Sequence, residues 1–324
     1  MTVMRYAEAL NAALREEMQR DPTVFLFGED IGRYGGVFKV SKGLMEEFGE
    51  QRVRDTPISE QAMTGMVVTA AMTGTKPVLE IMFADFLPLT LDALVNQASV
   101  FGYLWEGQVE MPFVLRTQGG GGVGTGAQHA KCLDALVTHI PGIKVVAPAT
   151  PADAKGLLKS AIRDKQPVVF LEHKLLYNIR GEVPDEDYIV PIGKARICRE
   201  GRDVTIIATS KMVIEAENAA KLLEKEGINA EVIDLRTLRP LDINTIKASI
   251  AKTHHVVVVN EGWKFGGYTA ELSASIVDYC FDDLDAPIER VAMPDMAIPY
   301  AETLETAVLP NAEKIAAAAR KALK

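Results

Sequence analysis

The stretch Val24-Phe25-Leu26-Phe27-Gly28-Glu29-Asp30 shows the pattern on which the whole chain is built. Its first four residues are apolar, and a glycine and two acidic residues follow them. A short uninterrupted apolar run is typical of a strand that is buried on both faces, as in a parallel sheet. The polar residues then fall at the carboxyl end of the strand, where parallel α/β sheets bind their ligands.

Similar β-rich runs recur through the first half of the chain, and predicted helices separate them. The runs are residues 53–58, 77–82, 112–117, 144–148 and 167–172, and the helices lie around 60–73, 87–104, 129–139 and 151–163. This alternation predicts an α/β protein with a mainly parallel sheet.

A second α/β domain follows an acidic, proline-bearing segment between Gly181 and Lys194, which we interpret as a linker. Beyond it we predict strands at 204–208, 230–235, 256–259 and 288–293. We predict one helix from about 212 to 226, a second helix between the second and third of these strands, and a C-terminal helix from about Asn311. A chain of 324 residues is also long enough for two domains. We therefore predict three-layer α/β/α domains at 1–185 and 195–324, the second being smaller.

Composition excludes several classes of function. The formal charge of −9 and the absence of a long basic run argue against binding to nucleic acid or to an anionic membrane. No stretch is apolar enough to span a bilayer, and the first twenty residues lack the apolar block of a signal peptide. Cys132, Cys198 and Cys280 form no C-x-x-C pair, which argues against a disulfide framework or a cysteine zinc site. These features predict a cytoplasmic protein.

The glycine-rich run 119–126 precedes His129. It lacks the Gly-Lys-Ser/Thr of a P-loop and the acidic residue of a dinucleotide fingerprint, so a nicotinamide-dependent oxidoreductase is the weaker alternative. One interpretation is a flexible surface loop, and the other is a backbone that closely approaches a ligand. A lone histidine is more often structural than catalytic. However, imidazole suits proton transfer near neutral pH, and we predict that His129 opens a helix at the carboxyl edge of the sheet.

Glu60 follows Ser59, a candidate N-cap, and would lie in the first turn of a helix. An acid there can simply compensate the helix dipole, which contributes about 0.3–1 kcal/mol. The helix that follows carries almost no charge, which predicts burial in a core or between subunits, and we favour a subunit interface. The aromatic residues of 83–86 come just after a predicted strand, where they could pack in the core or face a flat ring.

Seven motifs occur in an order that resembles one family closely. They are residues 27–30 (with Gly35-Gly36), 55–60, 128–129, 141–146, 153–156, 234–237 and 240–242. The family is that of the β subunits of the decarboxylating component of 2-oxo acid dehydrogenases, which includes the pyruvate, branched-chain 2-oxo acid and acetoin dehydrogenases. The similarity spans nearly the whole chain. It implies a pyrimidine-binding first domain and a second domain that is similar to the C-terminal domain of transketolase.

The resemblance implies a thiamine diphosphate site shared with an α subunit, which holds the diphosphate and Mg2+. No Gly-Asp-Gly motif for that task occurs here, as expected of a β subunit. The family's roles map onto Glu60 as the catalytic, cofactor-contacting acid, Ile58 as an apolar neighbour, Phe86 as the ring-stacking aromatic and His129 as the active-site histidine. Leu89 departs from members that have a polar residue there. A structural K+ is common in the family, but carbonyl ligands leave no side-chain signature, so no metal ligand is assigned.

The implied partners are an α subunit in an α2β2 heterotetramer and a dihydrolipoyl acyltransferase core. The implied reaction is oxidative decarboxylation of a 2-oxo acid such as pyruvate, with acyl transfer to lipoyl groups; acetoin is the alternative substrate. A carboxyl group at position 60 would hydrogen-bond the pyrimidine ring and tune the basicity of its amino group. His129 would donate or orient a proton. A different hypothesis makes the chain mainly an assembly subunit, whose second domain docks on the core.

Overall fold

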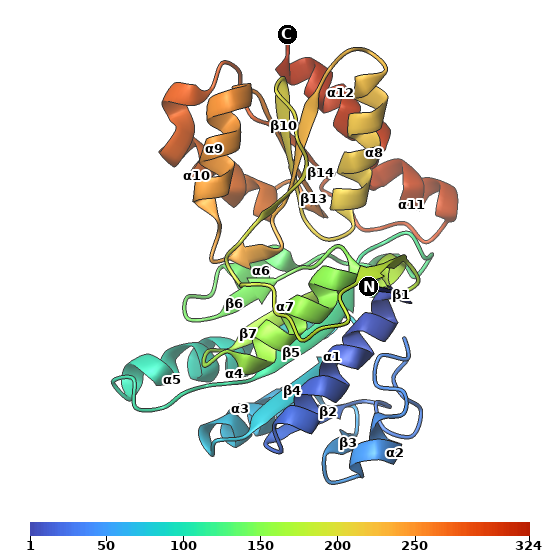
Figure 1. The fold of residues 1–324 in the computed structure, drawn as a ribbon, viewed down its shortest axis with the longest axis vertical. Helices are drawn as coiled ribbons and strands as arrows, with labels where there is room; N and C mark the ends of the chain where they lie inside the picture. The colour runs from blue at the N-terminus through green and yellow to red at the C-terminus, as the bar shows by residue number, and fades with distance from the viewer. The chain divides into compact units, whose positions relative to one another are not determined.

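The computed structural model describes all residues from 1 to 324. The chain forms two compact units, the first from residues 1–119 and 136–192 and the second from residues 120–135 and 193–324 (Figure 1). Each unit has its own sheet and core. The segment 120–135, which contains the glycine-rich run and His129, therefore packs with the second unit, whereas sequence periodicity had placed it within the first domain.

The first unit contains a parallel sheet in the order β6-β7-β5-β4-β2-β3. The strands are β2 (Val24–Gly28), β3 (Val53–Asp55), β4 (Lys76–Ile81), β5 (Val114–Gly119), β6 (Lys144–Val146) and β7 (Val168–His173). Every residue of β5 and β7 is buried, as expected for strands that helices cover on both faces. The predicted parallel α/β sheet is confirmed.

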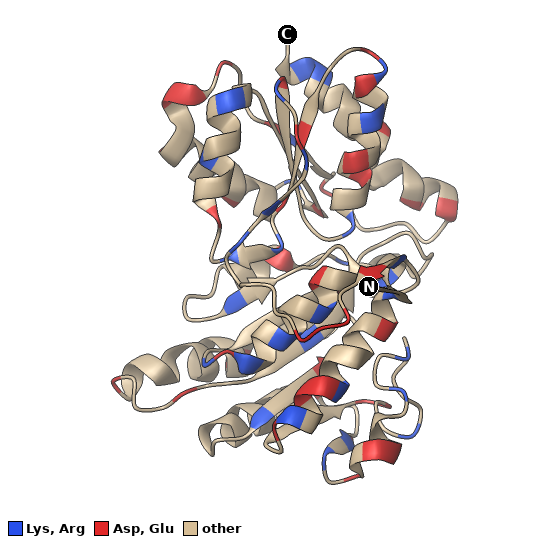
Figure 2. Cartoon of the chain, in the orientation of Figure 1, with Lys and Arg blue, Asp and Glu red and all other residues tan.

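The helices of this unit pack in pairs, α1 with α7 and α3 with α4. They are α1 (Tyr6–Arg20), α2 (Leu44–Phe48), α3 (Glu60–Met72), α4 (Leu87–Ala93), α5 (Ser99–Leu104) and α7 (Pro151–Arg163), with a π-helical turn at Leu94–Ala98. Figure 2 marks both basic and acidic residues along the ribbon of α1. Two of them pair with α7, because Lys159 contacts Glu16 at 2.6 Å and Arg163 contacts Glu17 at 2.6 Å.

The segment predicted as a linker begins inside a strand. β8 (Arg180–Val183) pairs antiparallel with β1 (Thr2–Arg5), and Thr2 lies opposite Val183. The interpretation of 181–194 as wholly irregular is therefore wrong at its start. The two short strands stabilise each other across a large sequence separation, which local periodicity does not register.

The second unit has a sheet in the order β14-β13-β10-β11-β9. Its strands are β9 (Arg196–Arg199), β10 (Val204–Ala208), β11 (Ala230–Asp234), β13 (Val256–Trp263) and β14 (Glu289–Met293), and only β9 pairs antiparallel. Figure 1 shows α8 (Met212–Glu224) and α12 (Ala312–Ala322) on one side of this sheet and α9 (Ile243–Thr253) and α10 (Tyr268–Cys280) on the other. The smaller elements are β12 (Thr237–Arg239) and α11 (Glu302–Val308).

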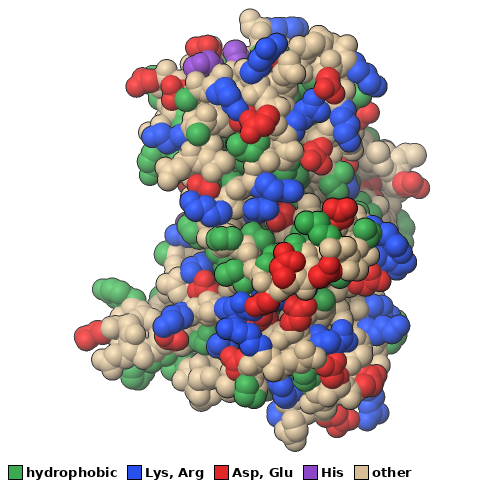
Figure 3. Space-filling model, viewed as in Figure 1, with side chains coloured by type: hydrophobic (Ala, Val, Ile, Leu, Met, Phe, Trp, Pro, Cys, Tyr) green, Lys and Arg blue, Asp and Glu red, His purple; other side chains and the backbone are tan.

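No helix combines the length and the hydropathy that a bilayer crossing requires. On the face that Figure 3 shows, acidic and basic side chains are interspersed rather than gathered by sign.

Candidate active site

The carboxyl edge of the first sheet gathers residues from three neighbouring strands. Gly28, the last residue of β2, lies in register with Asp55 of β3 and with Glu80 of β4. The amide of Thr56 donates to the carbonyl of Gly28 at 2.9 Å, which turns the chain after β3 back toward β2. Because these strands are parallel, the segments that follow them emerge at the same edge.

Glu60 is the first residue of α3, and Ser59 is its N-cap residue, as predicted. The Ser59 side chain makes no capping hydrogen bond, so the predicted side-chain cap is wrong. The Glu60 side chain is buried, with 7% of the residue exposed. A carboxylate is favoured at a helix N-terminus, but that effect operates equally well on the surface, so it does not account for the burial.

Glu29 is a second buried acid at this edge, and one of its oxygens, Oε1, has no hydrogen-bond partner. Burial raises the pKa of Glu29, and the nearby charges of Glu60, Asp30 and Glu80 raise it further. Buried polar atoms are normally paired, so an unpaired carboxyl oxygen is a feature that requires an explanation. A group that presents hydrogen-bond donors would satisfy it.

Arg116, from the middle of β5, compensates part of this negative charge. Its guanidinium donates to Glu172 at 2.7 and 2.9 Å and to Glu80 at 2.7 Å. Although burial disfavours the charged form, these two carboxylates outweigh burial and raise the pKa of Arg116. Glu80 is therefore bound within the chain, whereas Glu29 is not fully satisfied.

The other predicted cofactor contacts lie in the first unit with Glu60. Ile58 is 80% exposed, and Phe86 is half-buried with an edge-on contact to Phe83 at 6.5 Å between ring centres. Leu89, on α4, is exposed. A buried acid with an accessible apolar side chain and an aromatic ring fits a flat nitrogen-containing ring such as a pyrimidine.

His129 lies in the second unit and does not open a helix. It follows a single 3-10 turn, Gly126–Gln128, and the helix predicted around 129–139 is only α6 (Asp134–Thr138). Gly120, Gly122, Gly124 and Gly126 all have positive φ, between 65° and 91°, a region that glycine adopts without strain. This backbone excludes a helix up to Gly126, and residues 129–133 are also non-helical.

The glycine-rich loop is held by two acidic side chains of its own unit. Glu305 on α11 accepts the amide of Gly122 at 2.8 Å and that of Gly124 at 3.0 Å, and Glu261 on β13 accepts the amide of Gly121 at 2.5 Å. The loop ends at His129, whose carbonyl accepts the Thr125 hydroxyl at 2.9 Å. The interpretation as a flexible loop is therefore wrong, because the backbone donors are tied to buried carboxylates.

The structure thus brings Ile58, Glu60 and Phe86 into one unit and places His129 in the other. Sequence reasoning assigned no role to three acids that shape these regions, Glu29, Glu261 and Glu305. Glu29 directly follows β2, and Glu261 follows the apolar run 256–259 that begins β13, a signal that was visible in the sequence. Glu305 lies in an ordinary helical segment and left no local signal. No group of three or more His, Cys, Asp or Glu side chains is placed to hold a metal ion.

Two family matches cover most of the chain. Residues 2–180 match the transketolase pyrimidine-binding domain, and residues 193–315 match the transketolase C-terminal domain. A solved structure described as a split-gene transketolase, inactive β4 tetramer, superimposes with a TM-score of 0.81 at 25% identity, covering 99% of this chain and 98% of that one. The fold and these domains define a two-domain protein of the transketolase type.

Sequence relatives narrow the class. The chain is 49% identical to the mitochondrial pyruvate dehydrogenase E1 component subunit beta-2 of Oryza sativa subsp. japonica over 98% of its own length and 86% of that protein. It is 47% identical to the 2-oxoisovalerate dehydrogenase subunit beta of Bacillus subtilis (strain 168), over 99% of both chains. The chain belongs to the family of β subunits of the thiamine diphosphate-dependent decarboxylating component of 2-oxo acid dehydrogenases.

Proposed function

We propose that this chain supplies the pyrimidine-binding half of a thiamine diphosphate site that catalyses oxidative decarboxylation of a 2-oxo acid such as pyruvate. The observation that carries the proposal is the buried pair of acids at the carboxyl edge of the first sheet, Glu60 at the start of α3 and Glu29 with an unpaired oxygen. Surface compensation of a helix dipole needs neither burial nor a second acid.

In this proposal Glu60 hydrogen-bonds a ring nitrogen of the pyrimidine, and Ile58 and Phe86 flank the ring. When bound, thiamine diphosphate supplies a carbon nucleophile for addition to the substrate carbonyl. Glu60 tunes that chemistry because a carboxyl group can hold the proton that the ring nitrogen shares. Arg116 helps to fix the surroundings because it binds Glu80 and Glu172 within the chain.

His129 is proposed as the residue that donates or orients a proton for the reacting substrate. Glu261 and Glu305 support this role, because they hold the loop that leads to His129 in one conformation. Because the backbone is already fixed, less conformational entropy is lost when the catalytic side chain is positioned for each turnover.

We also propose that activity requires an α subunit, which holds the diphosphate and Mg2+. The two kinds of chain form an α2β2 heterotetramer, and any structural K+ belongs to this assembly. The exposed face of α3 supports a subunit contact, because its residues Gln61, Ala62, Met66 and Thr69 are accessible and uncharged. The solved relative of the same fold is described as an inactive β4 tetramer, which agrees with a need for a second chain type. Docking of residues 195–324 on an acyltransferase core completes the proposed assembly, and the cytoplasmic location stays a prediction.

The test is Glu60→Gln in enzyme assembled from this chain and a co-expressed α subunit. Glutamine preserves the size but cannot exchange the proton, so turnover should fall at least a hundredfold, or about 2.7 kcal/mol on the barrier. Exchange of the thiazolium proton for deuterium, followed by quenched-flow NMR, reports the affected step directly. Glu46→Gln, in the first turn of α2 and exposed, is the matched control. Wild-type exchange in Glu60→Gln would refute the role.

The substrate is tested with the same assembled enzyme and an artificial electron acceptor. The named relatives act in pyruvate and 2-oxoisovalerate dehydrogenases, so we expect turnover of a 2-oxo acid. Turnover of acetoin alone would replace that assignment with the acetoin dehydrogenase alternative.

A further inference from the structure

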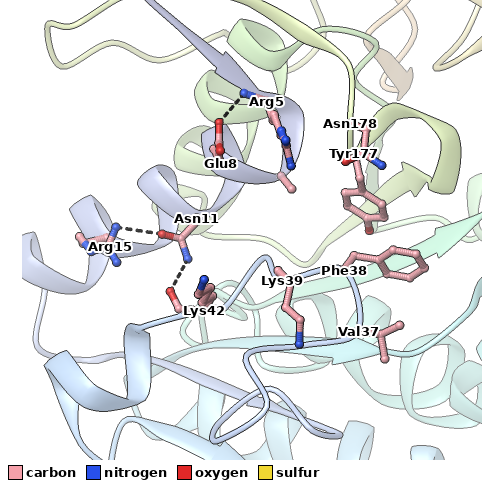
Figure 4. Close-up of a pocket in the computed structure, with 11 residues that line it drawn as sticks. Arg5, Glu8, Asn11, Arg15, Val37, Phe38, Lys39, Lys42, Tyr177 and Asn178 are labelled. Carbon is pink, nitrogen blue, oxygen red and sulfur yellow. Dashed lines mark hydrogen bonds between the residues drawn. The ribbon is translucent and has the colours of Figure 1, made fainter.

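A cavity of about 630 Å³ in the first unit shares no residue with the candidate active site. It lies between the start of α1, residues 37–42 of the loop after β2, and residues 177–178 (Figure 4). Its volume falls within the range of about 300–1,000 Å³ that is usual for small-molecule pockets.

The cavity is cationic although the chain carries a net charge of −9. Four basic side chains and one acidic side chain line it: Arg5, Arg15, Lys39, Lys42 and Glu8. Arg15 is engaged by Glu47 at 2.7 Å, and the Lys39 amine donates to the carbonyl of Tyr34 at 2.9 Å. No carboxylate of the chain pairs with the guanidinium of Arg5 or with the amine of Lys42. With Glu8 in the lining and Glu47 on Arg15, the four cations less these two carboxylates leave a net charge of +2 at the cavity.

One wall of the cavity is aromatic and rigid. The rings of Phe38 and Tyr177 stack at 4.5 Å between centres with 19° between their planes. The Tyr177 hydroxyl donates to Glu172 at 2.7 Å, and Glu172 is itself held by Arg116. Figure 4 shows this pair across the opening from Arg5 and Glu8. The wall is therefore preformed and offers apolar surface beside the cations.

The loop that carries Lys42 is also fixed. The Asn11 side chain donates to the carbonyl of Val40 at 2.6 Å and to that of Lys42 at 3.0 Å, which ties the loop to α1. The first turn of α1 reaches the cavity through Ala7 and Glu8, and the Glu8 carboxylate accepts the Arg5 amide at 2.7 Å, so it offsets the positive end of the helix dipole there. A preorganised cationic site loses less entropy when it binds an anion than a mobile one does.

We propose that this cavity binds a small molecule that carries two or more linked phosphate groups. A net charge of +2 requires at least two negative charges for neutralisation, and Arg and Lys side chains are groups that proteins use to bind phosphates. The polyphosphate contacts Arg5 and Lys42, and any apolar part of the ligand packs on Phe38 and Tyr177.

The test is calorimetric titration of the full-length chain with ADP, inorganic tripolyphosphate and adenosine. We expect ADP and tripolyphosphate to bind, adenosine not to bind, and both affinities to fall as salt is added. Tighter binding of ADP identifies a nucleotide as the ligand, whereas equal binding identifies the polyphosphate group alone. Failure of both anions to bind at millimolar concentration refutes the proposal.

Substitutions in the lining of the cavity test whether ADP binds there. Arg5→Glu and Lys42→Glu should each weaken the binding of ADP at least tenfold, which is about 1.4 kcal/mol, and Lys42→Gln should weaken it less. Lys225→Glu, an exposed lysine of the second unit, is the matched control for charge and should bind as wild type. Glu60→Gln should also bind as wild type, which separates this cavity from the cofactor site.

Both side chains are exposed, so circular dichroism should show that the variants fold. Unchanged affinity in Arg5→Glu and Lys42→Glu would refute the site, and so would loss of ADP binding when the α subunit is present, since the cavity would then be a subunit contact.

Discussion

Replacement of Glu305 by alanine tests whether a buried carboxylate sets the conformation of the glycine-rich loop. Glu305 is 1% exposed, and it accepts two backbone amides of the loop, those of Gly122 and Gly124. A hydrogen bond to a charged group contributes about 1.5–3 kcal/mol, so two would contribute about 3–6 kcal/mol if both amides stayed dry. Gly122 is exposed, and water replaces part of that loss. We therefore expect local opening of the loop to become easier by about 2–4 kcal/mol.

Native-state hydrogen exchange measures this quantity at the affected amides. A change of this size corresponds to about 30- to 700-fold faster exchange at Gly122 and Gly124, because each 1.4 kcal/mol is a factor of ten. Strands of the second sheet should keep their protection, since the loop lies outside that sheet. Turnover of the assembled enzyme should fall as well, because the loop leads to His129.

Two further variants make the result specific to the carboxylate. Glu305→Gln keeps one acceptor oxygen, so its exchange rates should lie between those of wild type and of Glu305→Ala. Glu302→Ala removes an exposed acid from the same helix and should leave the loop unchanged. Wild-type exchange at Gly122 and Gly124 in a folded Glu305→Ala protein, or an equal effect of Glu302→Ala, would show that the carboxylate does not hold the loop.

Further predictions concern catalysis and stability. His129→Ala should preserve the fold by circular dichroism while lowering turnover at least tenfold, or about 1.4 kcal/mol, and unaltered turnover would make His129 structural. The Thr23 hydroxyl, together with Lys76, lowers the pKa of Asp21 to about 2. A depressed folded pKa stabilises the protein above the unfolded value of 3.8 and ceases to do so as pH falls through about 2. Asp21→Asn should therefore cost about 1 kcal/mol in urea unfolding at neutral pH and progressively less as the pH falls from about 4 toward 2, and a pH-independent cost would contradict this cause. Arg116→Met leaves two buried carboxylates unpaired and should lower stability by about 3–5 kcal/mol in the same assay, where wild-type stability would be inconsistent with the ion pairs.

The sequence by itself determined where most helices and strands lie. The predicted limits of α7 and β10 are those observed, and α3 begins at Glu60 and ends before Gly74, which has a φ of 88°. Local signals account for this success. Thr150 caps α7 by accepting the amide of Asp153, and an apolar run such as that of β10 needs only burial to become a strand.

Tertiary structure alone decided which distant residues meet. The pairing of β1 with β8, the hold of Glu305 on the glycine-rich loop and the contacts of Arg116 with Glu80 and Glu172 all join residues that are far apart in the chain. Periodicity predicts which face of a helix or strand a residue lies on, but it does not predict which residue will contact it. The partner of a buried charge is the opposite charge that tertiary packing places beside it. The same limit applies to the helix predicted from 129, because the structure has a 3-10 turn before His129 and a helix that begins only at Asp134.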